Sequence, residues 1–510
     1  MNIIRKGLLL NEKGGYPMKL CDMLKNIEYK VVKGPSDITI SRLVYDSRKV
    51  QDGDVFVCIK GAKWDAHDSV IDVIKAGAVA VVIEKDLDSE IIAKVADSVA
   101  IIKVGSTRHA LACMAAAYFD YPSTKLVTIG VTGTKGKTTT AYMIRAVLEQ
   151  AGVKTGLIGT VETIIGDEVI PSANTTPESY IVQEYFDRMA KAGCKAVVME
   201  VSSQGLMMDR VAGFTFDYGI FTNLSKDHIG ENEHKDFEDY MSCKAKLFSR
   251  CKHGILNIDD KHYADMIKDA TCTIETFGLS AEADLRASDI KLITKPGVIG
   301  ISYNLEGIIN MPVEIDIPGK FNVYNTLTAI AVCRHFTDDL ELMKKVLLDI
   351  RVRGRVEIID VSPKYTLMVD YAHNAMSLES LLVSLKEYNP KRIVTLFGCG
   401  GNRSKDRRYE MGEVSSRLSD LTIVTSDNPR FEKPEDIIED IITGVKRADG
   451  KYITIIDRKE AIKYVIENGE EGDVIVLAGK GHEDYQEIEG VKYPMDERVI
   501  IEEIKKELNL

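Results

Sequence analysis

The chain has 510 residues, of which 45% are hydrophobic and 28% charged, and this predicts about three ordinary globular domains. A net charge of −12 with no basic face argues against a nucleic-acid partner, and no apolar run approaches the roughly 20 residues that span a membrane. Nine cysteines stand singly, without a C-x-x-C pair, so we expect neither a zinc site nor disulfides and a cytoplasmic location.

Residues 1–17 hold a short apolar patch followed by charges, which is typical of a flexible tail rather than a signal peptide. Residues 18–122 then alternate short strands and helices. The expected elements are strands over 54–59, 78–83 and 101–104 and helices over 69–76 and 110–118. Two polar clusters, at 45–48 and 61–65, have the composition of turns, and Pro122 marks a linker.

The second segment, residues 123–350, opens with the stretch on which the functional prediction depends. An apolar run over 126–131 breaks at Gly133 and Gly136, and a helical pattern begins at Lys137. A strand, a glycine loop and a helix N-terminus in this order bind a polyphosphate, because backbone N–H groups turn toward the phosphates. Lys137 can reach the terminal phosphates, and the Thr138 hydroxyl is placed to ligate Mg²⁺.

The loop departs from the general pattern at its start. Val131 stands where the first glycine is expected, and Gly130 comes one position early. The prediction of a nucleoside triphosphate site therefore rests on the narrower pattern G-T-x-G-K-T. The candidate loop residues are Gly133, Thr134, Lys135, Gly136, Lys137, Thr138 and Thr139.

Two further strands of this segment end in polar residues. The strand over 195–200 ends at Glu200, where a carboxylate beside a phosphate loop commonly provides a second ligand for Mg²⁺. The strand over 218–221 runs into the polar residues 222–228. Since no Asn-Lys-x-Asp guanine signature is present, we expect ATP rather than GTP.

The third segment, residues 351–510, is the most regular. Four apolar strands, over 365–369, 392–397, 421–425 and 474–478, each run into a polar cluster, at 370–374, 398–403, 426–430 and 479–484. Helical patterns alternate with these strands, which predicts a parallel sheet whose carboxyl edge carries one ligand site. Glycines and forked arginines in the clusters suit a small, doubly charged substrate.

An ATP domain joined to a second ligand domain is typical of a synthetase driven by phosphoryl transfer. ATP would phosphorylate a carboxylate, and an amine held by the other domain would attack the acyl phosphate. The alternative from another class is a P-loop NTPase acting as a switch, which would not require a second full-size ligand domain.

Ten ordered motifs make the chain similar to a known family. They are GTKGKTT, NTTP (174–177), EVSS (200–203), TNLSKDH, GKFNVYN (319–325), GRVE (354–357), DYAH, GCGGNR, DNPR and GKGHEDYQ, and with them the chain resembles the Mur ligases. The resemblance implies an α/β fold of three domains: a UDP-binding domain over 18–122, an ATPase with a mostly parallel sheet over 123–350, and a Rossmann-like domain over 351–510. It also implies a monomeric ATP-dependent ligase that adds meso-diaminopimelate to UDP-N-acetylmuramoyl-L-Ala-D-Glu through an acyl phosphate.

The resemblance also assigns residues to the nucleotide substrates. Tyr45, Ser47 and the 61–65 loop would hold the UDP end, which replaces the interpretation of these clusters as turns. The muramoyl dipeptide would be held by Asn174, Thr175, Thr176, Ser202 and Arg210. Asn322 and Asn325 would meet the adenine, and Arg355 and Asp370 would complete the ATP site.

Two metal positions are implied. Thr138 and Glu200 would hold one Mg²⁺, and His228 would hold a second together with a carbamylated lysine, for which Lys244 is the best match and Lys246 the neighbouring alternative. The expected catalytic residues are Lys137, Glu200, His228 and Lys244.

The amino-acid site rests on the run Asp427-Asn428-Pro429-Arg430, which resembles that of ligases that take meso-diaminopimelate. Arg430 can fork onto the distal carboxylate, and Glu483 can take the distal ammonium. The remaining contacts of the motif are matched by Arg403 and Gly479. The alternatives are L-lysine or another diamino acid as the substrate, or a ligase similar to folylpolyglutamate synthetase.

Three places depart from the family pattern. Residues 229–234 read IGENEH instead of a shorter Leu-Asp-x-His run, residues 374–376 replace the usual Thr-Pro after DYAH, and Met208 stands in place of a common Gln. These changes bear on metal geometry and on dipeptide affinity.

Overall fold

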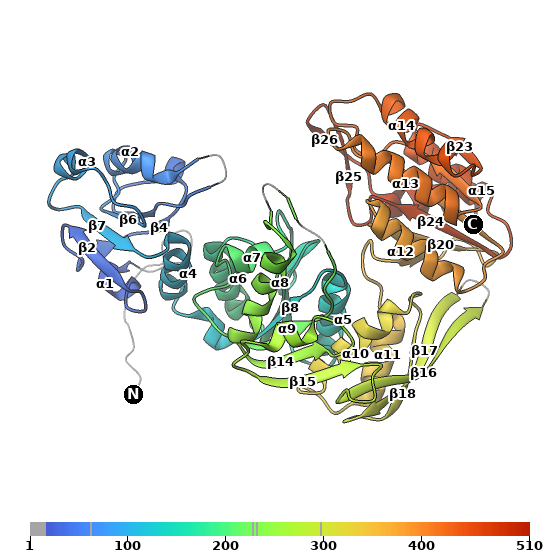
Figure 1. Cartoon of the computed structure of the whole chain (residues 1–510), viewed down its shortest axis with the longest axis horizontal. Helices are drawn as coiled ribbons and strands as arrows, with labels where there is room; N and C mark the ends of the chain where they lie inside the picture. The colour runs from blue at the N-terminus through green and yellow to red at the C-terminus, as the bar shows by residue number, and fades with distance from the viewer. Residues whose placement is uncertain (1–16, 62–63, 227–228, 231–232, 296–297) are drawn as a thin grey trace. The chain divides into compact units, whose positions relative to one another are not determined.

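The structure is a computed structural model that describes residues 17–61, 64–226, 229–230, 233–295 and 298–510 (Figure 1). Three predicted features lie wholly or partly outside the described residues: residues 1–16 of the predicted tail, positions 62–63 of the 61–65 loop, and His228. Two compact units make up the chain: one extends to Phe277 and includes Ala331–Phe336, and the other comprises Gly278–Ile330 and Thr337–Leu510. The expected domain boundary near residue 122 lies inside the first unit.

The first unit begins with a five-stranded sheet. Its strand order is β2 (Tyr29–Lys33), β7 (Ala100–Val104), β6 (Ala80–Ile83), β5 (Val55–Val57) and β4 (Leu43–Val44), and all neighbours except β2 and β7 run parallel. Its helices are α1 (Leu20–Met23), α2 (Val70–Lys75), α3 (Ser89–Lys94) and α4 (Thr107–Tyr118), and β1 (Met18–Lys19) pairs with β3 (Thr39–Ile40). The strands expected over 54–59, 78–83 and 101–104 and both expected helices are therefore confirmed.

A larger sheet follows in the same unit. Its strand order here is β11 (Glu168–Pro171), β10 (Glu162–Ile165), β9 (Thr155–Ile158), β12 (Ala196–Glu200), β8 (Val127–Thr132), β13 (Phe216–Phe221), β14 (Cys251–Asn257) and β15 (Thr273–Gly278). The strands from β9 to β15 are parallel, as expected for a phosphate-loop domain. The helices are α5 (Lys137–Gln150), α6 (Ser179–Lys191), α7 (Ser203–Met207), α8 (Phe237–Ala245) and α9 (Tyr263–Ile267).

The order of these strands positions the site. β12 and β13 are the two neighbours of β8, with Glu200 in register with Val131 and Phe221 in register with Thr132. Residues that follow β8, β12 and β13 therefore meet at one edge of the sheet. Successive residues of β8 and β12 are buried, so both faces of the sheet are covered there, which explains the continuous apolar runs that predicted these strands.

The second unit starts with an antiparallel meander of β16 (Leu285–Lys295), β17 (Val298–Gly307) and β18 (Met311–Ile315). α11 (Leu340–Asp349) packs on β18. α10 (Phe321–Cys333) begins in this unit, and its last residues are grouped with the first.

The C-terminal sheet has the order β19 (Glu357–Ile359), β20 (Thr366–Asp370), β24 (Asp473–Ala478), β21 (Arg392–Phe397), β22 (Leu421–Val424) and β23 (Tyr452–Thr454). All neighbours except β19 and β20 are parallel, which confirms the predicted sheet and its four strands. The helices are α12 (Ala375–Lys386), α13 (Lys405–Leu418), α14 (Pro434–Arg447), α15 (Arg458–Glu467) and α16 (Glu497–Leu508), and a hairpin of β25 (Tyr485–Ile488) and β26 (Val491–Pro494) follows β24.

All nine cysteines are free, and six of them are buried. Among the described residues, no helix combines the length and the apolar character needed to cross a membrane.

Candidate active site

The phosphate loop connects β8 to α5. Gly133 has φ +152° and Gly136 has φ +85°, and a Cβ at Gly133 would lie 2.0 Å from the Thr222 hydroxyl. Only glycine fits such a backbone at such a close approach. α5 begins directly after Gly136, so its first backbone N–H groups and the positive end of its dipole face the loop. The loop thus has the local structure of an anion-binding site.

Lys137 folds back over this loop. Its Nζ donates to the carbonyl oxygen of Gly133 at 2.8 Å and to that of Thr134 at 3.1 Å. These two carbonyls keep the ammonium beside the loop, where the predicted phosphates would bind.

Asn223, which follows β13, supports the loop from the neighbouring strand. Its carbonyl accepts from the Thr134 N–H at 2.9 Å, and its side-chain oxygen accepts from the Lys135 N–H at 2.9 Å. Its amide also donates to the Lys135 carbonyl at 3.0 Å. The sequence signal for this residue was its place directly after an apolar strand, but only the strand order shows that it holds the loop.

Glu200 and Thr138 lie together, as the sequence predicted for a metal pair. The Thr138 hydroxyl donates to Glu200 Oε2 at 3.0 Å, and both side chains are buried. Thr160, which the sequence reading missed, donates to the same carboxylate from its N–H at 2.8 Å and its hydroxyl at 2.9 Å. Hard oxygen donors of this kind suit Mg²⁺, so the residues present fit the ion.

Lys244 lies on α8 and is buried, with 1% of its surface exposed, whereas Lys246 is exposed. The Lys244 Nζ donates to the Gly133 carbonyl at 2.8 Å and lies 4.7 Å from the centre of the Tyr240 ring. Of the two candidates for a carbamylated lysine, only Lys244 therefore reaches the phosphate loop.

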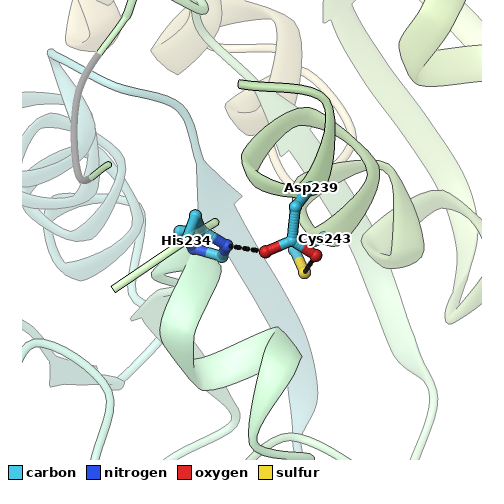
Figure 2. A group of neighbouring side chains, drawn as sticks. All are labelled: His234, Asp239 and Cys243. Carbon is cyan, nitrogen blue, oxygen red and sulfur yellow. Dashed lines mark hydrogen bonds and ion pairs between the residues drawn. The ribbon is translucent and has the colours of Figure 1, made fainter. Parts of the chain in front are cut away.

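A second polar cluster lies at the start of α8, where Asp239 and Cys243 share one face and His234 approaches from the preceding segment (Figure 2). The three groups are close enough to share a metal ion. Both ring nitrogens of His234 already have partners, however: Nδ1 lies 2.9 Å from Asp239 Oδ2, and Nε2 lies 2.8 Å from the Ser203 hydroxyl. The fully buried His234 thus bridges α7 and α8, a role that the departure at 229–234 did not predict.

The candidate residues for the muramoyl dipeptide gather around Glu200. The Thr176 hydroxyl donates to the Glu200 carbonyl at 2.9 Å and accepts from the Ser202 N–H at 2.9 Å. Arg210 donates to the Thr176 carbonyl at 3.0 Å, and the Thr175 hydroxyl lies 3.0 Å from that of Thr160. Asn174 is exposed beside them.

Tyr45 and Ser47 lie in the N-terminal part of the unit. The Tyr45 ring packs against Tyr180 with centroids 5.9 Å apart. Burial, followed by the nearby Glu178, raises the pKa of Tyr45 to about 12, so its hydroxyl stays protonated. Ser47 begins a short 3-10 helix, and the side chain of Asp46 caps it by accepting from the Arg48 N–H at 3.1 Å.

The second unit contains the remaining ATP candidates. Asn322 and Asn325 are buried and linked to each other, with Asn325 Nδ2 donating to Asn322 Oδ1 at 2.8 Å. Asp370 accepts from the N–H groups of Val356 and Ala372, both at 2.8 Å. Burial raises the pKa of Asp370, and the charge of Arg355 opposes that shift.

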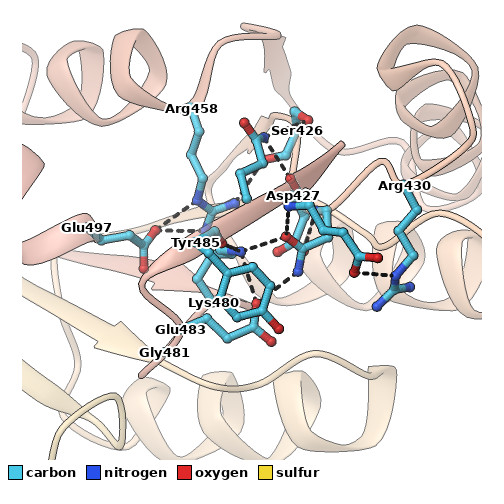
Figure 3. Close-up of polar contacts among 12 residues, drawn as sticks. Ser426, Asp427, Arg430, Arg458, Lys480, Gly481, Glu483, Tyr485 and Glu497 are labelled. Carbon is cyan, nitrogen blue, oxygen red and sulfur yellow. Dashed lines mark hydrogen bonds and ion pairs between the residues drawn. The ribbon is translucent and has the colours of Figure 1, made fainter. Parts of the chain in front are cut away.

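The predicted amino-acid cluster forms around the loops after β22 and β24 (Figure 3). Asn428 Nδ2 donates to Glu483 Oε2 at 2.8 Å. The buried Lys480 donates to Asn428 Oδ1 and to Glu483 Oε2, both at 2.9 Å, so it already occupies the carboxylate that was expected to take a distal ammonium.

Three other candidates border this cluster. A Cβ at Gly479, which has φ +108°, would lie 3.2 Å from Asp427 Oδ2, so the loop passes close to that carboxylate. Arg430 has φ +52° and directs its Nη1 to the Gly401 carbonyl at 2.7 Å. Arg403 is exposed in the loop after β21. The sequence predicted that these groups lie at one edge of the C-terminal sheet. It did not predict a role for Lys480, because a lysine between two glycines gives no sign that it is buried.

Family models match three stretches of the chain. The model of the Mur ligase family catalytic domain matches residues 39–119, that of the Mur ligase middle domain matches 131–333, and that of the Mur ligase glutamate ligase domain matches 354–481.

Individual proteins match over nearly the whole length. The UDP-N-acetylmuramoyl-L-alanyl-D-glutamate--2,6-diaminopimelate ligase of Clostridium perfringens is 41% identical over 494 residues, which cover 96% of this chain and 99% of that protein. A solved structure of a ligase with the same name matches with a TM-score of 0.70 and 28% identity, covering 97% of this chain and 100% of that one. The folylpolyglutamate synthase of Mycobacterium tuberculosis shares the fold at a TM-score of 0.56 and 16% identity, over 73% of this chain and 92% of its own.

Proposed function

The chain belongs to the Mur ligase family, and from this membership we propose that it joins meso-diaminopimelate to UDP-N-acetylmuramoyl-L-Ala-D-Glu with hydrolysis of ATP to ADP and phosphate. The diaminopimelate ligase of Clostridium perfringens, which is 41% identical over 96% of this chain, supports this reaction. Only a shared fold supports the alternative of a ligase similar to folylpolyglutamate synthetase.

Each segment has its own part in this proposal. Residues 18–122 hold the UDP end, with Tyr45 and Ser47 among the contacts, residues 123–350 bind ATP, and residues 351–510 hold the amino acid. The dipeptide lies against Thr175, Thr176, Ser202 and Arg210, which surround Glu200. A monomeric state and a cytoplasmic location remain predictions.

The phosphoryl-transfer step depends on charge and position. The dipeptide's terminal carboxylate attacks the γ-phosphorus of ATP, the bond to the β-phosphate oxygen breaks, and ADP leaves. Lys137 and the N-terminus of α5 neutralise charge on the phosphates. Thr138 and Glu200 would hold one Mg²⁺, and His228 would hold a second together with Lys244, once that lysine is carbamylated. The ions would neutralise charge on the transferred phosphoryl group.

The second step forms the amide bond. A neutral amine of the amino acid attacks the acyl carbon, the proton of the amine is lost, and inorganic phosphate leaves with its bonding electrons. The C-terminal cluster orients this amine by binding the other end of the molecule.

One observation favours meso-diaminopimelate over lysine. Arg430 lies on the same loop as Asn428, whose side-chain amide donates to Glu483, so a guanidinium and a carboxylate lie at one edge of the sheet. A distal carboxylate and a distal ammonium need this combination, whereas lysine has no carboxylate for Arg430. Sites built around such a group reject analogues that lack it by roughly 10⁴–10⁵.

Phosphate release tests the proposal. The protein is incubated with ATP, Mg²⁺ and UDP-N-acetylmuramoyl-L-Ala-D-Glu, and either meso-diaminopimelate or L-lysine is added. We expect release with meso-diaminopimelate and far less with lysine. Preference for lysine would overturn the substrate assignment and keep the ligase, and no release with either would overturn the proposed function.

A further inference from the structure

The Arg430 guanidinium already binds a carboxylate of this chain. Its Nε donates to Glu487 Oε2 at 3.1 Å, and the two side chains are each about one-quarter exposed. Glu487 lies on β25, at a position to which the family resemblance gave no role. The group expected to receive the substrate's distal carboxylate is thus paired with a carboxylate of the chain itself (Figure 3).

The backbone fixes this pair. The Arg430 N–H donates to the Glu487 carbonyl at 2.9 Å, and the Glu489 N–H donates to the Arg430 carbonyl at 2.6 Å. Arg430 has φ +52°, a conformation that is uncommon for a residue with a side chain, and it forms a parallel bridge with Ile488. The loop and the hairpin therefore hold the base of the arginine side chain beside Glu487.

Glu483, a second carboxylate of the cluster, is engaged elsewhere. Glu483 accepts from Asn428 and Lys480, at 2.8 Å and 2.9 Å, and Lys480 is fully buried. Asn428 also accepts from the Glu487 N–H through Oδ1, at 2.9 Å, which links the two halves of the cluster. Glu487 is accordingly the acidic side chain that competes with an incoming carboxylate for Arg430.

Space around the guanidinium is limited on its other side. Its Nη1 donates to the Gly401 carbonyl, and a Cβ at Gly400 would lie 3.2 Å from the same nitrogen. A carboxylate can bind an arginine side-on, through Nε and Nη2, as a two-pronged fork, and Glu487 occupies Nε. Binding of the substrate in this side-on geometry requires Glu487 to leave.

We propose that Glu487 is a specificity-determining residue: its carboxylate occupies Arg430 until the distal carboxylate of the amino acid displaces it. The inference rests on the proposed function. The pair neutralises Arg430 in the free enzyme, so other small carboxylates bind there weakly. The distal carboxylate of meso-diaminopimelate displaces Glu487 because the rest of the molecule is held by the same cluster.

The test compares Glu487→Gln with the wild-type protein by the KM for meso-diaminopimelate at saturating ATP and UDP-linked dipeptide. Removal of the competing charge should lower this KM by up to about 5-fold, which corresponds to the strength of a partly exposed ion pair. The KM for lysine, or its inhibition constant if it is not a substrate, should not fall, because lysine does not displace Glu487. Inhibition by glutarate, a simple carboxylate probe, should become stronger.

The matched control is Glu489→Gln, which removes the same charge from an exposed position two residues away and should leave the KM unchanged. In an Arg430→Met background, Glu487→Gln should have no effect on the KM, because the competition no longer exists. This double-variant comparison separates competition from a general role of the hairpin in folding.

A KM for meso-diaminopimelate that stays the same or rises in Glu487→Gln would overturn the inference, since Glu487 would then support Arg430 rather than compete for it. Equal falls for meso-diaminopimelate and lysine would also overturn it. The proposed function is judged separately, by whether the wild-type protein releases phosphate with meso-diaminopimelate at all.

Discussion

Lys244 and Lys246 lie two residues apart on the chain but in different environments. Lys244 is buried and donates to the phosphate loop, while Lys246 is exposed. A buried ammonium is costly unless it is paired or modified. Carbamylation would replace that positive charge with an anion beside the phosphate loop.

The first prediction concerns Lys244. Lys244→Ala should lower ligase activity by about 100-fold or more, as loss of a group that supports a metal does, and added acetate should restore part of it. Isotope-labelled bicarbonate should give a carbamate signal by NMR in the wild-type protein and not in the variant. Lys246→Ala is the control and should stay active. Full activity of Lys244→Ala would contradict the assignment.

The second prediction concerns Arg430. Arg430→Met should lower kcat/KM for meso-diaminopimelate by roughly 10²–10⁴, because the distal carboxylate loses its charged partner. Activity with lysine should change far less. Arg417→Met makes the same change at an exposed position of α13 and serves as the control. Equal losses for the two amino acids would indicate a structural role for Arg430.

Helices α13 and α14 illustrate how elements pack to support the amino-acid site. A Cβ at Gly412 would lie 2.2 Å from the Ile441 carbonyl oxygen, and one at Gly444 would lie 2.0 Å from that of Tyr409. The two helices therefore approach each other through glycines, and the obstructing atoms belong to the backbone. α13 follows the loop after β21, and α14 follows the loop that carries Arg430.

The third prediction is that Gly444→Ala destabilises the protein. Alanine is favoured over glycine in a helix by ~1 kcal/mol, but overpacking costs ~1–3 kcal/mol, and a backbone carbonyl cannot move as a side-chain tip can. Urea unfolding should show a lower midpoint for the variant. Thr443→Ala, exposed on the same helix, should have little effect. A midpoint equal to or above that of the wild-type protein would show that the helices can separate without cost.

Buried charged groups in both units are paired or bonded, as with Lys244 in the first and Arg458 with Glu497 in the second. His482 is different, since it lies beside Tyr371 and near three arginines. Burial, followed by the charges of Arg355, Arg353 and Arg498, lowers the pKa of His482 to about 4. Folding therefore keeps this histidine neutral.

The fourth prediction follows for the stability of the whole protein. Between pH about 6.5 and about 4, His482 takes up a proton in the unfolded chain but not in the native state. The contribution of the neutral histidine to the free energy of unfolding is therefore complete above pH about 6.5 and is lost as the pH falls toward about 4. The loss is at most ~1.4 kcal/mol per pH unit. Urea unfolding of the wild-type protein and of His482→Asn should show a stability difference that shrinks on acidification. A constant difference would contradict the lowered pKa.

Much of the fold could be predicted because its signals are local. The strand runs at 126–131 and 392–397 are continuous and apolar since both faces of their sheets are buried, and the glycine loop at 133–136 has one physically favoured backbone. Parallel strands also place residues that follow them at one edge, which led from the sequence to Glu200 and to Arg430.

What the sequence by itself determined is the chemistry present at the strand ends: a phosphate loop, a carboxylate beside it, and an arginine suited to a carboxylate. Which groups are already paired was decided only by the tertiary structure. Asn223 holds the phosphate loop and Glu487 occupies Arg430, each from another segment of the chain, whereas Lys480 occupies Glu483 three residues away in its own loop. A hydrogen bond or ion pair depends on distances of about 3 Å, and those distances follow from strand order and loop packing rather than from spacing along the chain.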